Sequence, residues 1–124
     1  MSSPVILYTY SKCSTCRDAV AWLRDRGVAF DEKPVYETPP SKAELRTMLV
    51  HQGGEMKRLF NTSGLEYKAL DLKSRFGSLT EGEALSLLAS NGKLVKRPFL
   101  LAPGFGLVGF KEAVWEKAFS AATS

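Results

Sequence analysis

Two cysteines, Cys13 and Cys16, lie in the sequence Ser11-Lys-Cys-Ser-Thr-Cys16, between an apolar segment and an amphipathic one. The preceding run, residues 4–10, is short and apolar and predicts a buried strand. After the cysteines, apolar residues recur at helical spacing from Ala19 to Leu23, and a glycine at position 27 is typical of a helix end. The cysteine pair is therefore expected at a turn from a strand into a helix.

The next segments complete a first half and begin a helical region. Residues 28–36 predict a second strand, which Pro34 places at a sheet edge because proline cannot donate to the ladder. A crossover of this length favours parallel pairing with the first strand. The patterns Ser41-Lys-Ala-Glu44 and Thr80-Glu-Gly-Glu83 are capping boxes that predict two helix starts. Gly53-Gly54 is expected to end the first of these helices, and the second is expected to run towards residue 89 before Asn91-Gly92.

Between these two helices, residues 55–60 and 67–76 predict short helical pieces, and Asn61 is expected to cap a helix. The last third predicts an antiparallel hairpin with strands at 99–102 and 107–110, then a helix from about Lys111. The order is β-α-β, a helical insertion at about 41–92, then β-β-α. This is the thioredoxin arrangement, an α/β fold around a mixed four-stranded sheet, and we expect residues 1–124 to form one such domain.

The composition indicates a globular domain without membrane-spanning helices. Hydrophobic residues make up 44% of the chain and charged residues 24%, which is typical of a globular domain. The apolar runs are too short for a membrane helix and no secretory signal is visible, so a cytoplasmic, membrane-free protein is expected. The net charge of +4 suits an anionic small substrate or an acidic partner better than direct nucleic-acid binding. Its charges are interspersed, which favours a solvated surface, and we expect a monomer.

The cysteine turn is the strongest chemical signal. Cys13 would lie at the helix N-terminus, where unpaired amides and the macrodipole stabilise a thiolate, and Lys12 adds a nearby positive charge. Cys16, one turn further on, is placed to attack a mixed disulfide formed on Cys13. We therefore interpret Cys13 as the attacking thiol and Cys16 as the resolving thiol, with Lys12, Ser14 and Thr15 as candidate substrate-binding residues.

Two other interpretations of the pair remain open. A Cys-x-x-Cys pair can be half of a zinc site, but zinc usually takes four ligands, and His51 is the only other cysteine or histidine in the chain. We therefore expect no metal. Alternatively the thiols could be inert and buried, as Cys16 on the apolar helix face would allow.

The sequence Lys96-Arg97-Pro98 opens an apolar strand and gives a second signal. In a thioredoxin arrangement this is the place of a cis-proline facing the active cysteine. We expect a cis bond before Pro98, with Arg97 directed towards Cys13 and Pro98 in the substrate-binding set. A surface arginine before a strand is the alternative.

With the cysteine turn and Lys96-Arg97-Pro98 together, the sequence resembles the arsenate reductase–Spx family of thioredoxin-fold proteins. The resemblance runs from about Val5 to Phe119. It includes Phe60-Asn-Thr-Ser-Gly64, Leu87-Leu-Ala-Ser-Asn-Gly92 and Leu107-Val-Gly-Phe-Lys-Glu112. It implies a thiol reductase with no tightly bound cofactor, supplied with electrons by glutathione or thioredoxin.

The family's arsenate reductases bind the oxyanion with three arginines, and the resemblance carries over Cys13 and Arg97 alone. Asn61 and Gly109 stand at the other two arginine positions. If each missing arginine contributes about 2 kcal/mol, two losses weaken oxyanion binding roughly a thousandfold. Weak or no arsenate reduction is therefore expected.

Spx regulators, by contrast, share the two-cysteine pair, which in them is a redox switch, and they bind the C-terminal domain of the RNA polymerase α-subunit. Gly53 or Gly54 could match a glycine of that contact. The resemblance therefore implies a polymerase-binding redox regulator as the alternative function.

Overall fold

The computed structural model describes residues 5–123 and, among them, all side chains except those of residues 122 and 123. The first half holds β1 (Ile6–Thr9), α1 (Ser14–Asp25) and β2 (Asp31–Pro34). The second half holds β3 (Phe99–Ala102), β4 (Phe105–Val108) and α6 (Glu112–Thr123). Between them lie α2 (Lys42–His51), α3 (Leu65–Ala69), α4 (Leu72–Arg75) and α5 (Glu81–Ser90), with short 3-10 helices η1 (Met56–Leu59), η2 (Phe76–Ser78) and η3 (Gly92–Leu94).

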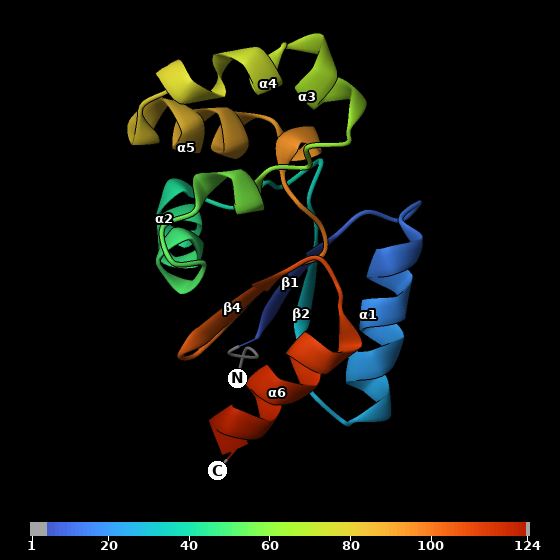
Figure 1. Ribbon diagram of the computed structural model, residues 1–124. Helices are drawn as coiled ribbons and strands as arrows, with labels where there is room; N and C mark the ends of the chain where they lie inside the picture. Colours follow the sequence, from blue (N-terminus) through green and yellow to red (C-terminus); the bar gives the residue numbers. More distant parts are fainter. Residues whose placement is uncertain (1–4, 124) are drawn as a thin grey trace.

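The four strands form one mixed sheet in the order β2-β1-β3-β4. β1 runs parallel to β2 and antiparallel to β3, and β3 runs antiparallel to β4. Figure 1 shows α1 and α6 along one face of the sheet, α2 on the opposite side, and α3 to α5 stacked beyond one end of the strands. This is the α/β, thioredoxin-like arrangement that the sequence predicts, with the helical insertion between the two halves.

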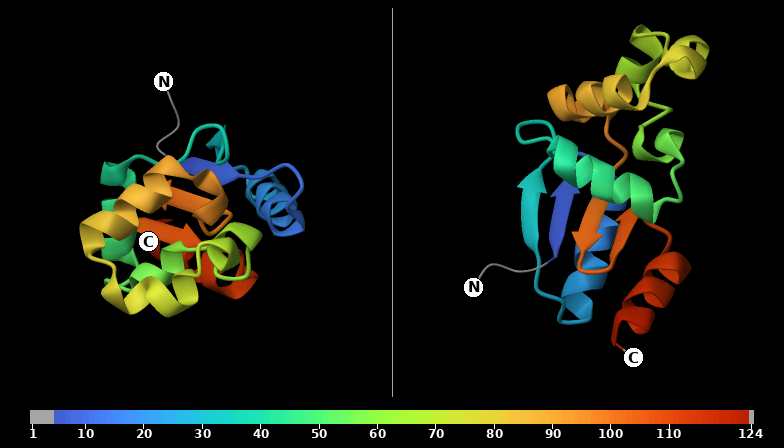
Figure 2. Two further views of the ribbon diagram at one scale, coloured as in Figure 1. Left: turned by 90° about the horizontal axis from the view of Figure 1, so that it is seen from above. Right: turned by 90° about the vertical axis from the view of Figure 1, so that its left-hand side faces the viewer.

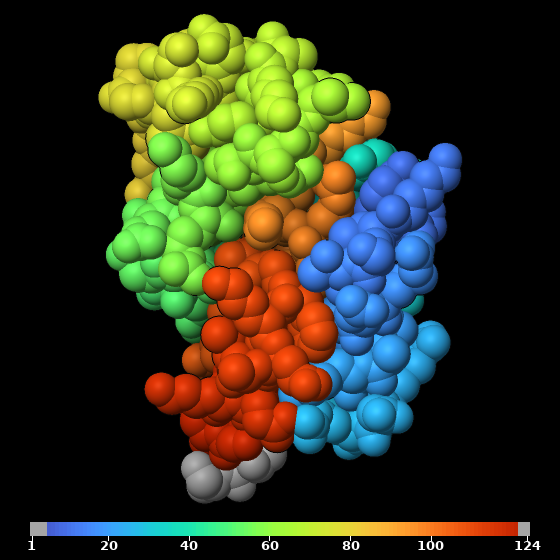
Figure 3. Space-filling view, turned by 45° about the vertical axis from the view of Figure 1, so that its right-hand side comes forward, coloured from blue at the N-terminus to red at the C-terminus, as the bar shows by residue number. Residues whose placement is uncertain are grey.

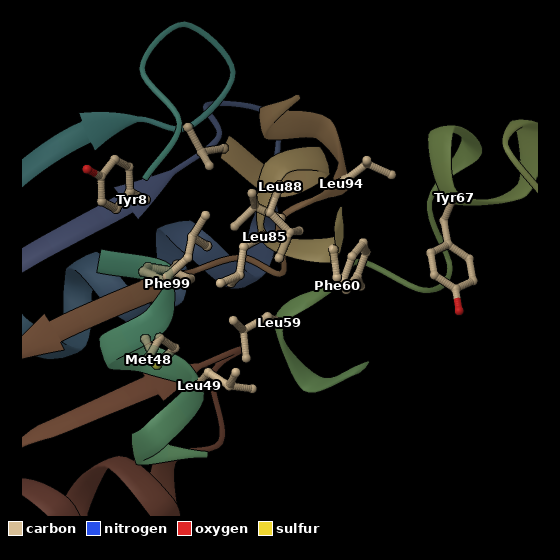
Figure 4. Close-up of a cluster of buried hydrophobic side chains, with 14 of the residues drawn as sticks. Tyr8, Met48, Leu49, Leu59, Phe60, Tyr67, Leu85, Leu88, Leu94 and Phe99 are labelled. Atoms are coloured by element: carbon tan, nitrogen blue, oxygen red, sulfur yellow. The ribbon is translucent and has the colours of Figure 1, made fainter. Parts of the chain in front are cut away.

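Side chains alternate between the two faces of the sheet, as the two-residue period of a strand requires. Leu7 and Leu100 face α1 and α6, where they join the aromatic residues Trp22 and Trp115. Their neighbours, Tyr8 among them, face the opposite side and join a cluster that runs into the insertion. Figure 4 shows this second cluster, in which Met48 and Leu49 of α2 and Leu85 and Leu88 of α5 come together with residues of β1, β3 and η1. The insertion is therefore packed on the sheet through a shared apolar core.

Glycine is required where the insertion returns to the sheet. A Cβ on Gly92 would lie 1.8 Å from the backbone oxygen of Val35, so any side chain there would push η3 away from the end of β2. This close approach brings the segment before β3 beside the ends of β1 and β2. The second view in Figure 2 shows the insertion above that end of the sheet.

Both predicted capping boxes are present, at Ser41 and Thr80. Gly53 and Gly54 follow α2 with positive φ, as a chain leaving a helix often requires. β1 is shorter at both ends than its predicted range of 4–10, and residue 4 lies outside the described residues. β2 is likewise shorter than predicted, and it lies at the sheet edge as Pro34 indicates.

Two predictions for the rest of the chain were wrong in detail. The second hairpin strand is Phe105–Val108 and not 107–110, because a two-residue turn with Gly104 at φ 86° pairs Ala102 with Phe105. The predicted helix at 67–76 is interrupted at Asp71, whose φ of 52° is left-handed. The short helical piece predicted at 55–60 is present, as a 3-10 helix. No helix in the described part of the chain is long and apolar enough to cross a membrane.

Candidate functional site

Cys13 lies at the junction of the β1 loop and α1. Its amide donates to the carbonyl of Tyr10 at 3.0 Å, which closes the turn after the strand. It is the N-cap residue of α1, and its Sγ accepts a hydrogen bond from the amide of Cys16 at 3.3 Å. The first turn of α1 carries no acidic residue that would repel a negative sulfur. The sulfur of Cys13 therefore lies at the N-terminal end of α1, with a backbone N–H directed at it.

Cys16 has a different environment, although it is only one turn away. Its side chain is 1% exposed, against half-buried Cys13, and neither cysteine is in a disulfide. Burial raises the pKa of Cys16 to about 12, and its side-chain hydrogen bond with Cys13 also raises it. Cys16 is therefore a neutral thiol at physiological pH, able to donate to the sulfur of Cys13.

Arg97 reaches the same site from the segment before β3. The Arg97-Pro98 peptide bond is cis, as the sequence predicts. The guanidinium carbon lies 5.3 Å from the ring centroid of Tyr10 and 5.2 Å from that of Tyr36, and those rings are stacked 4.1 Å apart. Because the two distances are nearly equal, the guanidinium lies beside the stack and not above one face, where the cation–π attraction would be strongest.

The charge of Arg97 is not neutralised by a carboxylate of the described residues. Its Nη1 is buried without a hydrogen-bond partner, and no carboxylate of the described residues forms an ion pair with it. A buried donor in this state favours binding of an acceptor from outside the chain. Arg97 also lowers the pKa of Cys16, opposing the larger effect of burial, so its positive charge acts on the thiol pair.

These groups open onto a cavity of about 640 Å³, which we call the thiol cavity. The sheet and its flanking segments supply one wall and the insertion supplies the other. In Figure 3 the orange segment before β3 lies between the blue start of α1 and the green part of the insertion. The lining residues are Tyr10, Cys13, Thr15, Tyr36, Asn61, Ser63, Gly64, Leu65, Glu66, Lys93, Lys96 and Arg97.

The residues that the sequence predicts for the site are distributed unevenly around this cavity. Thr15 lines it together with Cys13 and Arg97. Lys12 and Ser14 are exposed and outside the lining, and Pro98 is buried behind it, with its carbonyl accepting from Gly109 at 2.8 Å. The structure thus brings one of the four candidate substrate-binding residues to the cavity wall.

Asn61 does not cap a helix, and that prediction was wrong. The N-cap of α3 is Gly64. The backbone N–H of Asn61 instead donates to the carbonyl of Leu94 at 2.7 Å. This bond holds the end of η1 against η3. It places the Asn61 side chain in the thiol cavity.

Tyr10 and Tyr36 were not among the predicted site residues, although the sequence contains a signal for them. Each tyrosine follows closely on one of the two parallel strands, β1 and β2. The carboxyl ends of parallel neighbouring strands lie at the same edge of a sheet, so the two rings are expected to meet. Glu66 and Lys93 carry no comparable signal, because only the packing of the insertion brings them to the cavity.

No group of three or more histidine, cysteine, aspartate or glutamate side chains within residues 5–121 is arranged to hold a metal ion. His51 lies at the end of α2 and is exposed.

The chain is thus a thioredoxin-like protein with a thiol pair at the start of α1 and a cis-proline segment beside it. The ArsC family model matches residues 8–118, and the chain belongs to this family. Among curated proteins, the chain is 44% identical over 110 residues to the uncharacterized protein YusI of Bacillus subtilis, covering 89% of this chain and 93% of that one. It is 28% identical to the global transcriptional regulator Spx of Streptococcus mutans, covering 87% of this chain and 77% of Spx.

Solved structures give the same assignment. An ArsC family related protein of Bacteroides fragilis has a TM-score of 0.88 at 39% identity, covering 94% of this chain and 98% of that chain. A possible arsenate reductase of Streptococcus mutans has a TM-score of 0.86 at 39% identity, covering 94% and 99% of the two chains. The resemblance noted in the sequence is thus confirmed at the level of family and fold.

Proposed function

We propose that the protein is a thiol–disulfide oxidoreductase in which Cys13 attacks the substrate and Cys16 resolves the mixed disulfide. The main support for this proposal is the contrast between two neighbouring thiols. Cys13 faces the thiol cavity and its sulfur accepts an amide hydrogen bond, whereas Cys16 is buried and protonated. A nucleophile at the surface and a protected second thiol are what a two-step exchange requires.

The reaction begins with attack of the Cys13 thiolate on one sulfur of a substrate disulfide. A mixed disulfide forms, the substrate's S–S bond breaks, and the departing sulfur leaves as a thiolate that takes up a proton from water. Cys16 then loses its proton and attacks the sulfur of Cys13. The Cys13–Cys16 disulfide forms and the second substrate sulfur leaves as a thiol, so the protein's two thiols supply both electrons.

Arg97 stabilises negative charge on the reacting sulfurs in this scheme, because its guanidinium faces the same cavity. Glutathione or thioredoxin, each a thiol reductant, would reduce the Cys13–Cys16 disulfide and complete the cycle. No tightly bound cofactor enters the reaction.

Selective alkylation tests this assignment. At pH 8 iodoacetamide should label the folded protein once, at Cys13, because a pKa of about 12 keeps Cys16 in its unreactive thiol form. The denatured chain, in which Cys16 is no longer buried, should take two labels. Equal labelling of both cysteines in the folded protein would overturn the roles given to them.

Arsenate reduction is proposed to be weak or absent. Arg97 is the single arginine that lines the thiol cavity, where Asn61 stands at a second arginine position of the family's arsenate reductases. At the third position, Gly109 has a φ of 70°, and a Cβ there would lie 3.3 Å from Cε of Lys96. Asn61→Arg should therefore raise arsenate turnover in a glutathione- and glutaredoxin-coupled assay, whereas Gly109→Arg should strain the backbone and lower the protein's stability. Arsenate turnover by the parent at the rate of its disulfide exchange would contradict this.

A second candidate function is a redox-sensing regulator that binds RNA polymerase. The observation in its favour is the similarity to Spx and to the regulatory protein MgsR of Bacillus subtilis, each at 28% identity. Gly53 and Gly54 both have positive φ, which accounts for glycine at these positions without a partner. Capture of this protein by the immobilised C-terminal domain of the polymerase α-subunit would favour the regulator, and its absence would favour the enzyme.

A further inference from the structure

Three neighbouring hollows in the surface share their walls and lead away from Cys13. The thiol cavity adjoins a hollow of about 290 Å³, which adjoins a third of about 680 Å³. Arg97 lines the first two, Arg58 and Lys111 line the last two, and Lys96 lines all three. We call the three together the basic groove. In Figure 3 the orange segment that carries Lys96 lies between the green part of the insertion and the red segment before α6.

The groove carries the excess positive charge of the whole chain. Its walls contain two acidic residues, Glu55 and Glu66, and six cationic ones: Lys57, Arg58, Lys93, Lys96, Arg97 and Lys111. The chain has 17 lysines and arginines and 13 acidic residues, so eleven of each remain outside the groove. The net charge of +4 therefore arises from this one surface, whereas the sequence, in which these residues are interspersed, favoured an evenly solvated one.

Most of this charge is available to a ligand. The two ion pairs along the groove, Arg58–Glu55 at 3.8 Å and Lys93–Glu66 at 4.0 Å, are exposed and contribute little. The other four cations form no ion pair with any carboxylate among residues 5–121. Met56, Phe76 and Val108 are half-buried and add apolar surface to the far hollow, against which the aliphatic part of a bound side chain can pack.

We propose that the basic groove binds an extended acidic segment of a partner protein and so presents that partner's disulfide to Cys13. This proposal rests on the proposed oxidoreductase function and names its class of substrate. The thiol cavity alone is large enough for a small ligand, but Lys57, Arg58 and Lys111 lie in the further hollows, where such a ligand does not reach. A nucleic acid would satisfy the charge but brings no sulfur to Cys13.

The chemical step is the exchange already described. The partner's disulfide accepts two electrons from Cys13 and Cys16, the protein's disulfide forms, and the partner leaves as a dithiol. The groove adds no bond to this scheme. It raises the rate of encounter and holds the acidic segment while the sulfurs react.

Two synthetic peptides of equal length test the proposal with the reduced, full-length protein. Both contain the same internal disulfide, which is flanked on each side by aspartate and glutamate in one peptide and by serine and glutamine in the other. At low ionic strength the acidic peptide should be reduced about tenfold faster, and 1 M salt should remove most of the difference. Equal rates at low salt would overturn the proposal.

Charge-removing variants locate the effect. Lys57→Gln with Lys111→Gln should remove most of the preference for the acidic peptide. The matched control, Lys73→Gln with Lys117→Gln, removes the same charge from exposed positions outside the groove and should keep the preference. Equal loss of the preference in both double variants would show that the net charge of the protein causes it, and would reject binding in the basic groove.

A binding measurement separates failure of the groove from failure of the chemistry. Fluorescence anisotropy should show tighter binding of the labelled acidic peptide than of the neutral one when alanine replaces both peptide cysteines. Preferential binding without reduction of either disulfide peptide would reject the oxidoreductase function and keep the groove. Equal binding of the two alanine peptides would reject the groove, whatever the reduction rates.

Discussion

Two regions of the molecule meet at the thiol cavity: the sheet with α1 and α6, and the helical insertion from α2 to η3. The first region supplies Cys13, Thr15 and Arg97, whose positions follow from strand ends and a helix start. The second supplies Asn61, Ser63, Gly64, Leu65, Glu66 and Lys93, all from loops or short helices. In the proposed function the reacting groups therefore come from strand ends and a helix start, and the insertion forms part of the surface that a substrate meets.

Because the two regions supply different groups, the chemistry and the selectivity of the site can change independently. A thiol at a helix start needs a few fixed atoms around it, which the sheet provides. The insertion is joined to the sheet by its apolar core, so its exposed loops can vary in sequence without moving Cys13.

The largest effect is expected for the attacking thiol. Cys13→Ser should lower the rate of disulfide exchange about a thousandfold or more, because a serine hydroxyl is not ionised at neutral pH and cannot replace the thiolate. Steady-state turnover of a peptide disulfide measures this. Cys16→Ser is the matched control and should still form the mixed disulfide on Cys13. Unchanged turnover in Cys13→Ser would place the chemistry elsewhere.

A core substitution in the insertion should lower the stability of the whole protein. Leu88 of α5 is fully buried in the cluster that also contains Tyr8 and Phe99 of the sheet. Leu88→Ala should lower the free energy of unfolding by about 2–5 kcal/mol while unfolding stays a single transition. Leu65→Ala, at a side chain that is 84% exposed, is the control and should change little. Two separate transitions in denaturant would show that the insertion unfolds by itself.

Loss of the arginine beside the thiol pair should have a moderate effect. Arg97→Gln should slow alkylation of Cys13 at pH 7 about threefold to tenfold, since the thiolate loses a neighbouring cation. Arg24→Gln, which removes an exposed arginine in the last turn of α1, should leave the rate unchanged. An equal rate in the parent and in Arg97→Gln would remove Arg97 from the reacting site.

The smallest effect concerns a helix cap in the insertion. Thr80 accepts from the amide of Glu83 at 3.1 Å, and the Glu83 carboxylate accepts from the Thr80 amide at 2.8 Å. Thr80→Ala should lower the free energy of unfolding by about 1 kcal/mol and leave disulfide exchange unchanged. The control is Thr47→Ala, at an exposed position of α2. A slowed exchange in Thr80→Ala would show that the insertion reaches further into the chemistry than proposed.

The sequence was sufficient for the parts of the fold that local rules determine. The short apolar run that contains Leu7 and Tyr8 indicates a buried strand, and the capping boxes at Ser41 and Thr80 indicate helix starts. Pro98 restricts the backbone just before β3. The predicted register of the hairpin was wrong because two glycines, Gly104 and Gly106, allow alternative turns. Only the pairing of Ala102 with Phe105 decides between them.

The site was predictable on one wall only. Cys13 and Arg97 follow from a strand-to-helix turn and a proline that opens a strand. Asn61 and Lys93 reach the cavity because Gly92 packs directly on the backbone of Val35, a contact between residues far apart in the chain. The insertion's wall therefore required the three-dimensional structure.

A redox titration of the parent protein directly tests whether Cys13 and Cys16 form a disulfide with each other. The protein is equilibrated with glutathione buffers of increasing oxidation, quenched with acid and analysed by mass spectrometry for free thiols and glutathione adducts. Both thiols should disappear together in one two-electron transition, with Cys13 and Cys16 joined in a disulfide and no lasting adduct. A stable glutathione adduct on Cys13 with a free Cys16 at equilibrium would contradict this prediction.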